Sequence, residues 1–236
     1  MIALVAIATA FVSCKKPDSN GNNVIEAKNV ENSSSQIATV KAVLFDDVND
    51  EEVYLASCKY EKNGFKITLP KTLSENYLQS GGDYYPEWIT ISDKNAKVGY
   101  FELLAYDKTG DEIGHFYLER KTINEFQDGE AAYFYSDRNF TMKGTDEITE
   151  EDEENGISYT YSEEYNCSLK KGYNIIYITY DVEYNMPNIK VKILLTTQKP
   201  SGTNWVWKFE TWGTEKKSPA HSFKSIKDVK KNFLHK

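Results

Sequence analysis

The sequence predicts an all-β protein made of two consecutive antiparallel β-sandwiches, of the immunoglobulin-like or transthyretin-like kind. Aromatic residues make up 14% of the chain, with 17 Tyr among them, and this composition is typical of strands. Long stretches rich in Ala, Leu and Glu are absent, so we expect few helices. Short alternating segments are separated by turn residues at regular spacing, which favours a sandwich.

The first stretch of the chain has the character of an export signal. An apolar run from Ile2 to Val12 is far shorter than the roughly 20 residues that span a bilayer as a helix. The polar sequence KKPDSNGNN follows, so we expect a signal peptide over residues 1–13 and a mature chain that begins at Cys14. Ser13-Cys14 resembles the cleavage site of bacterial lipoproteins, in which the cysteine is lipidated. An ordinary cleaved signal peptide or an N-terminal anchor is the alternative.

Residues 14–36 are rich in Asn, Ser and Lys and show no apolar period. They predict a lipidated, flexible tether that places the folded part away from a membrane.

The first β domain is expected over residues 37–124. Asn63-Gly64 supplies the positive φ values of a tight hairpin, and the turn 107–110 joins a second hairpin. An irregular stretch with one helical turn is expected between Lys71 and Gly82. The strands expected in this domain are 39–45, 53–60, 65–70, 88–91, 98–106 and 112–120.

The second β domain is expected over residues 130–213. The acidic run 146–154 predicts a solvated hairpin loop. Residues 175–178 are apolar on both faces, which marks a strand buried on each side. Trp205, Trp207 and Phe209 share one parity and are expected in the core.

The basic tail, residues 214–236, contains seven Lys against two acids. Phe223, Ile226, Val229 and Phe233 recur at helical spacing and predict a short amphipathic helix. It would dock on its own β domain, with a membrane surface or a partner as alternatives.

Cys58 and Cys167 are the two cysteines that remain once Cys14 is assigned to lipid. In YLASCKY the alternation places Tyr54, Ala56, Cys58 and Tyr60 on one face. We therefore expect both cysteines to be small core residues with free thiols. A disulfide between them, which an oxidising compartment permits, is the alternative.

The sequence lacks the residues that several classes of function require. The net charge of −8 argues against a nucleic-acid partner. Only three His occur, and there is no G-x-S-x-G, H-E-x-x-H, P-loop or dinucleotide motif. An EF-hand aligned on Gly156 fails because its twelfth position falls on Ser162. The sequence thus predicts no cofactor, no metal site and no catalytic residues.

The segment 83–88 is the candidate ligand-binding loop. Glycan binding needs flat aromatic faces beside hydrogen-bonding groups. Gly81-Gly82 and Pro86 favour a loop that presents Tyr84, Tyr85 or Trp88 outward. Trp88 precedes a strand, so we expect it to pack in the core rather than contact a ligand.

Several segments together resemble uncharacterised lipoproteins of the Bacteroidetes cell envelope that are built from β domains. The segments are Ser13-Cys14, GFKITLP (64–70), FELLAYDKTGDEIG (101–114), AYFYSD (132–137) and CSLKKGYN (167–174). The resemblance implies a lipoprotein anchored in the outer membrane, on its periplasmic or cell-surface side, and carries no established activity. Lys15-Lys16 stand where surface-exported relatives have acids, so retention in the inner leaflet of the outer membrane stays an alternative to surface export.

The function expected from these observations is a non-catalytic envelope module that binds a glycan or an envelope protein. A fimbrial or adhesin-type subunit that assembles by strand exchange is the alternative. A glycoside hydrolase is the third candidate, because it requires only two suitably spaced carboxylates.

Overall fold

The computed structural model describes residues 23–46, 51–80, 86–121 and 127–212, and these are all-β as predicted. The strands of the first half are β1 (Val24–Lys28), β2 (Thr39–Asp46), β3 (Glu51–Lys59), β4 (Gly64–Thr68), β5 (Gln79–Ser80), β6 (Thr90–Ile91), β7 (Lys97–Tyr106) and β8 (Glu112–Lys121). Those of the second half are β9 (Gln127–Ser136), β10 (Phe140–Asp152), β11 (Ile157–Leu169), β12 (Gly172–Asn185), β13 (Asn188–Thr196) and β14 (Asn204–Thr211). The expected helical turn is the 3₁₀ turn η1 (Glu75–Tyr77). No helix among the described residues is long and apolar enough to cross a membrane.

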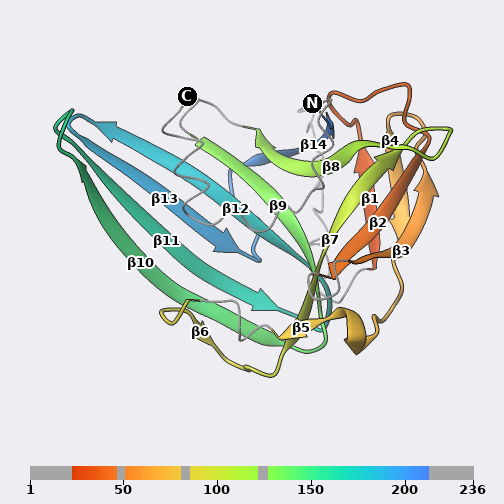
Figure 1. Ribbon diagram of the computed structural model, residues 1–236, viewed down its shortest axis with the longest axis horizontal. Coiled ribbons are helices and arrows are strands. Elements are labelled where there is room, and N and C mark those ends of the chain that lie inside the picture. The colour runs from red at the N-terminus through yellow and green to blue at the C-terminus, as the bar shows by residue number, and fades with distance from the viewer. Residues whose placement is uncertain (1–22, 47–50, 81–85, 122–126, 213–236) are drawn as a thin grey trace, which may run out of the picture.

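One large sheet contains strands from both halves of the chain. Its order is β3-β2-β7-β8-β9-β12-β13-β11-β10-β6, while β14 pairs with β8 and β5 pairs with β7. The long strands β10 to β13 reach out to one side, and β1 to β4 gather on the other (Figure 1). The expected arrangement as two separate sandwiches is not confirmed, because strand β14 of the second segment pairs with β8 of the first.

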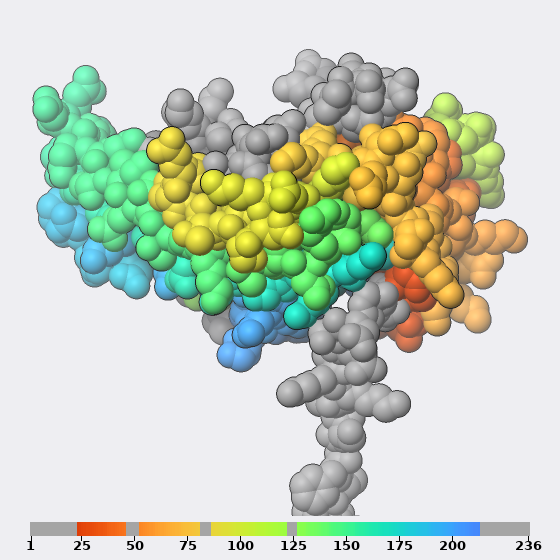
Figure 2. Space-filling model, turned by 90° about the horizontal axis from the view of Figure 1, so that it is seen from below, coloured from red at the N-terminus to blue at the C-terminus, as the bar shows by residue number. Residues whose placement is uncertain are grey.

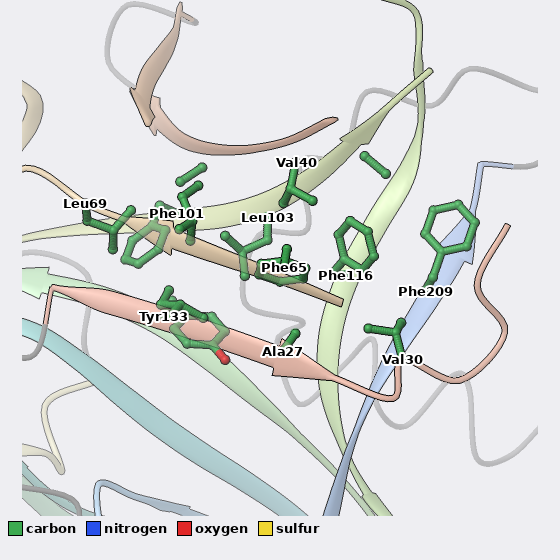
Figure 3. Packing of buried hydrophobic residues seen from close by; sticks show 14 of the residues in the cluster. Ala27, Val30, Val40, Phe65, Leu69, Phe101, Leu103, Phe116, Tyr133 and Phe209 are labelled. Carbon is green, nitrogen blue, oxygen red and sulfur yellow. The ribbon is translucent and has the colours of Figure 1, made fainter. Parts of the chain in front are cut away.

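The first apolar cluster lies between the large sheet and a small one formed by β1 and β4. Ile25, Ala27, Phe65 and Ile67 of the small sheet face the large sheet across this cluster. Phe65 contacts Phe116 of β8, with ring centroids 5.0 Å apart. Figure 3 shows these buried side chains packed together. The small sheet thus covers one face of β2, β7 and β8.

The small sheet is also tied to β14. Backbone bonds join Glu31 to Trp207 and Phe209, at 2.8 and 3.0 Å. Trp207 stacks on Tyr133 of β9, and Phe209 packs on Phe116. Trp205 and Phe209 are buried and Trp207 is partly buried, so the prediction that these three aromatics are core residues is confirmed.

A second apolar cluster covers the opposite face of the long strands. It includes Phe134 of β9, Met142 of β10 and Ile176 of β12. The segment that contains β6, in yellow, lies against the green start of β10 (Figure 2), where Ile91 pairs with Met142. Residues 175–178 of β12 contribute to clusters on both faces, as predicted.

Two expectations about irregular segments are wrong. Part of the flexible tether expected for residues 14–36 is strand β1, because Ile25 and Ala27 are buried against the first cluster. The acidic run 146–154 is not a loop up to Asp152, since β10 pairs with β11 continuously from Phe140 to Asp152. Glu147, Glu150 and Glu151 are exposed on the strand, so this stretch is polar in sequence although its backbone is paired.

A β-bulge changes the faces expected for β3. Ala42 pairs with Ala56 and Val43 pairs with Tyr54, so the register shifts by one residue at Leu55. Tyr54 therefore points to the other face from Ala56 and is 58% exposed.

Both cysteines have free thiols, as predicted. Cys167 is fully buried, whereas Cys58 is only half-buried.

Candidate functional site

Tyrosines and carboxylates gather on the face of the large sheet that points away from β1 and β4. In β7, Phe101, Leu103 and Ala105 belong to the first cluster, so the alternating residues point to the opposite face. We call this surface the acidic–tyrosine face. Its members are Tyr100, Glu102, Tyr106, Glu112, Tyr117, Asp128, Glu130 and Tyr180.

Glu102 lies at the floor of the acidic–tyrosine face and is 8% exposed. The Tyr100 hydroxyl donates a hydrogen bond of 2.7 Å to its Oε1. Its Oε2 is buried and accepts no hydrogen bond from any described residue. Burial raises the pKa of Glu102 to about 7, an effect that the Tyr100 hydrogen bond opposes and Glu112 and Glu130 reinforce. A buried carboxyl without a second donor is costly and needs an explanation.

The end of the β7–β8 hairpin holds Glu112 between two donors. Trp212, just after β14, donates from its indole Nε1 to Glu112 Oε1 at 2.6 Å. The Tyr106 hydroxyl donates to Oε2 at 3.4 Å. Burial and the nearby Glu112 carboxylate raise the pKa of Tyr106. The ring of His115 packs on Trp212, with centroids 4.6 Å apart, so the chain leaves β14 directly at this face.

Strands β9 and β12 carry the exposed rim of the face. Their register places Glu130 opposite Ile178 and Asp128 opposite Tyr180, and both acids are exposed. Burial raises the pKa of Tyr180, and Glu130 and Asp128 raise it further. Burial, with Glu119 as the next cause, raises the pKa of Tyr117 to about 12. These tyrosines are therefore neutral hydrogen-bond donors at neutral pH.

The chemistry of the face suits a ligand with several hydroxyl groups or with positive charge. Carboxylates such as Asp128 and Glu130 accept hydrogen bonds, and neutral phenols donate them. Tyrosine rings add flat apolar area of the kind that stacks on a sugar ring or a planar cation. Among the described residues, no group of three His, Cys, Asp or Glu could hold a metal ion.

A hollow lies over β1, β4 and the end of β3. Its lining includes Glu26, Lys28, Cys58, Lys59 and Lys66. Lys28 and Glu26 pair at 2.8 Å, and burial raises the pKa of the Cys58 thiol. Because its charges are mixed and already paired in part, this hollow offers less for ligand recognition than the acidic–tyrosine face.

The residues predicted from sequence fall elsewhere. Cys14, Tyr84 and Tyr85 lie outside the described residues, as does the helix expected in the basic tail. Trp88 is half-buried and packs edge-on against Tyr165 of β11, with ring centroids 5.4 Å apart. It packs against the second apolar cluster, which Tyr100 and Tyr180 of the acidic–tyrosine face also contact.

The residue that sequence reasoning missed is Glu102. A signal was present in FELLAYDK, where residues of both parities are apolar and one acid interrupts the run. A strand that is apolar on both faces is buried on both faces, so an acid within it must be buried too. Its hydrogen-bond donor Tyr100 is two residues away in β7, but the carboxylates that raise its pKa, Glu112 and Glu130, come from β8 and β9, and no local pattern reveals those.

No family model, curated protein or solved structure matches this chain.

Proposed function

We propose that this protein is a non-catalytic, lipid-anchored module of the bacterial outer membrane that binds a glycan through the acidic–tyrosine face. One observation carries the proposal: phenol donors and carboxylate acceptors from four strands meet on one face, around the buried carboxyl of Glu102. Perturbed carboxyls cluster at binding sites, because function there outweighs the cost of burial. The anchor rests on the Ser13-Cys14 sequence and the apolar run before it.

A protein partner is the other ligand class that the face would accept. A positively charged segment would meet Asp128 and Glu130 at the rim, and its binding affinity would fall strongly with added salt. The affinity for a neutral glycan would change little with salt, so salt dependence separates the two ligands.

A glycoside hydrolase remains the second candidate because of the raised pKa of Glu102, which is what a general acid requires. Such an acid must reach the glycosidic oxygen. With Oε2 buried and Oε1 engaged by Tyr100, Glu102 has no oxygen open to a substrate. We therefore favour a supporting role beneath a binding surface.

Glycan retention by the full chain tests the proposal. Tyr117→Ala should weaken retention by about tenfold or more, since an aromatic contact contributes about 1–3 kcal/mol. Tyr77→Ala is the matched control, because Tyr77 is 39% exposed in η1 and lies off this face. An array with no glycan retained at millimolar sugar would remove the proposal.

The anchor has a separate test. Cys14→Ala should abolish incorporation of radioactive palmitate and release the protein from the membrane fraction, because it removes the proposed lipidated residue. Unchanged labelling would end the lipoprotein proposal while leaving ligand binding untouched.

A further inference from the structure

We propose that the basic tail of this chain is the resting occupant of the acidic–tyrosine face, where it competes with the ligand. The juxtaposition that supports this is direct: Trp212, two residues before the tail, donates its indole hydrogen bond to Glu112 of that face. The competition rests on the proposed glycan binding, whereas the docking itself does not.

Charge complementarity is the first argument. The tail contains seven Lys and two acids. Beside the buried Glu102, the face contributes three carboxyl groups, namely Glu112 of β8 and Asp128 and Glu130 of β9. Attraction between opposite charges close to a protein surface favours this pairing over exposure of both partners.

Apolar complementarity is the second argument. The acidic–tyrosine face continues along β12 through residues of the same parity as Tyr180, which are Val182 and Tyr184. Tyr184 is 51% exposed, and Ile148 of β10, in the same cross-strand row as Val182, is 42% exposed. Large apolar residues exposed together mark an interaction surface. The helical spacing of Phe223, Ile226, Val229 and Phe233 supplies a matching apolar stripe.

Reach is the third argument. Trp212, where the described chain ends, is bonded to Glu112, which interacts electrostatically with Glu102, as does Glu130. Ten residues, 213–222, precede Phe223 and could extend roughly 33 Å. A helix over the next twelve would be about 18 Å long. β8, β9 and β12 are neighbours in the sheet, so two strand spacings of about 4.8 Å separate β8 from β12, and a linker of this length can cross them.

Zero-length carbodiimide cross-linking of the full chain tests the docking. We expect bonds between tail lysines, among them Lys224, Lys227 and Lys231, and the rim carboxyls Asp128 and Glu130, mapped by mass spectrometry. The triple reversal Lys224→Glu, Lys227→Glu, Lys231→Glu should abolish them. Adding Asp128→Lys and Glu130→Lys should restore cross-links in the opposite sense, which a general loss of folding would not.

The matched control is Lys190→Glu on β13, whose side chain is exposed and alternates with the buried Ile189 and Val191. It should leave the tail cross-links unchanged. Absence of intramolecular bonds to the face, or bonds that survive the triple reversal, would overturn the docking. So would binding to anionic vesicles without such bonds, which would assign the tail to a membrane surface.

Glycan retention separates the two proposals. If the tail covers the face nine-tenths of the time, the triple reversal should raise apparent affinity about tenfold. Cross-links with no change in affinity would overturn the competition. Failure of every variant, including the triple reversal, to retain glycan would overturn the proposed function and leave the docking standing.

Discussion

At the scale of single residues, Glu102 is the feature that packing alone does not explain. Its neighbours in β7 are buried apolar residues such as Leu103 and Leu104, and replacing a buried polar group by an apolar one of similar shape is often neutral or stabilising. Instead the chain keeps a carboxyl with one donor, Tyr100, and one unpartnered oxygen. The consequence is a titration close to neutral pH.

Glu102 should make the protein less stable as the pH rises from about 4.5 to about 7. Its pKa is about 7 in the folded protein against an ordinary value of 4.5, so in this range the folded state holds a proton that the unfolded state releases. The contribution of Glu102 to the free energy of unfolding is therefore greatest below pH 4.5, and about 3 kcal/mol of it is lost by pH 7. Urea unfolding at pH 5 and pH 7.5 measures the loss.

Glu102→Gln should flatten this dependence, because the amide stays neutral at both pH values. Glu61→Gln, at an exposed position beside the β3–β4 turn, is the control and should keep the wild-type slope. Parallel curves for wild type and Glu102→Gln would show that the carboxyl is ionised and solvated in the folded state.

The two thiols should differ in reactivity in the Cys14→Ala protein. Cys167 is fully buried and burial raises its pKa to about 12, so it should react with a thiol reagent only after unfolding. Cys58 is half-buried and should react in the folded state. A native titration that counts two thiols, or none, would contradict the described burial.

At the scale of elements, local patterns predicted most strands and missed the contacts between distant ones. The hairpins around Asn63-Gly64 and residues 107–110 follow from turn residues between alternating segments. Strand β1 was missed because five residues with two buried side chains give too short a pattern beside polar neighbours. The β8–β14 pairing joins residues about ninety positions apart, and nothing local encodes it.

The acidic half of β10 was predicted as a loop because its residues are polar, and its charges protect an open edge of the sheet. Beyond Lys143, this strand pairs with β11 alone, so its other edge is open within the described part of the chain. Its residues from Thr145 to Glu151 alternate little and are mostly acidic or exposed, with Glu147, Glu150 and Glu151 among them. Charged edges resist pairing with another chain. The charged edge therefore disfavours strand exchange at β10, which is the kind of pairing that a fimbrial subunit needs.

The β8–β14 pairing depends on Gly114. A Cβ atom at this position would overlap the carbonyl oxygen of Glu210 and lie 2.7 Å from the ring of Phe209. Gly114→Ala must therefore push β14 away from β8 and should cost about 3 kcal/mol of unfolding free energy, the upper range for overpacking. Gly202→Asn is the control, because φ there is +71° with no atom within 4 Å, and Asn tolerates that conformation. Equal effects from both variants would show that β14 yields without cost.

At the scale of the whole molecule, the two apolar clusters share their supporting strands. Phe101 of β7 and Tyr133 of β9 belong to the first cluster, while Tyr100 and Phe134, their neighbours in sequence, pack in the second. Strand β12 likewise places Ile175 and Ile176 in different clusters. A strand cannot unfold on one face only. The clusters are therefore coupled through the backbone of β7, β9 and β12, even though each lies on its own side of the sheet.

This coupling predicts a single cooperative unfolding transition, in contrast to the two transitions that independent domains over residues 37–124 and 130–213 would give. Phe116→Ala in the first cluster and Met142→Ala in the second should each lower stability by about 2–5 kcal/mol, because both side chains are almost fully buried. Each variant should shift the whole transition, whether it is followed by near-ultraviolet circular dichroism or by tryptophan fluorescence. Trp207 reports on the first cluster and Trp88 on the second, so variants in which Trp207 or Trp88 is the single remaining tryptophan can follow each side separately. Coincident midpoints for the two reporters are expected in wild type and in both destabilised variants. If Met142→Ala melts the Trp88 signal first and leaves the Trp207 signal at its original midpoint, the two halves unfold independently and the chain has two domains despite its shared sheet.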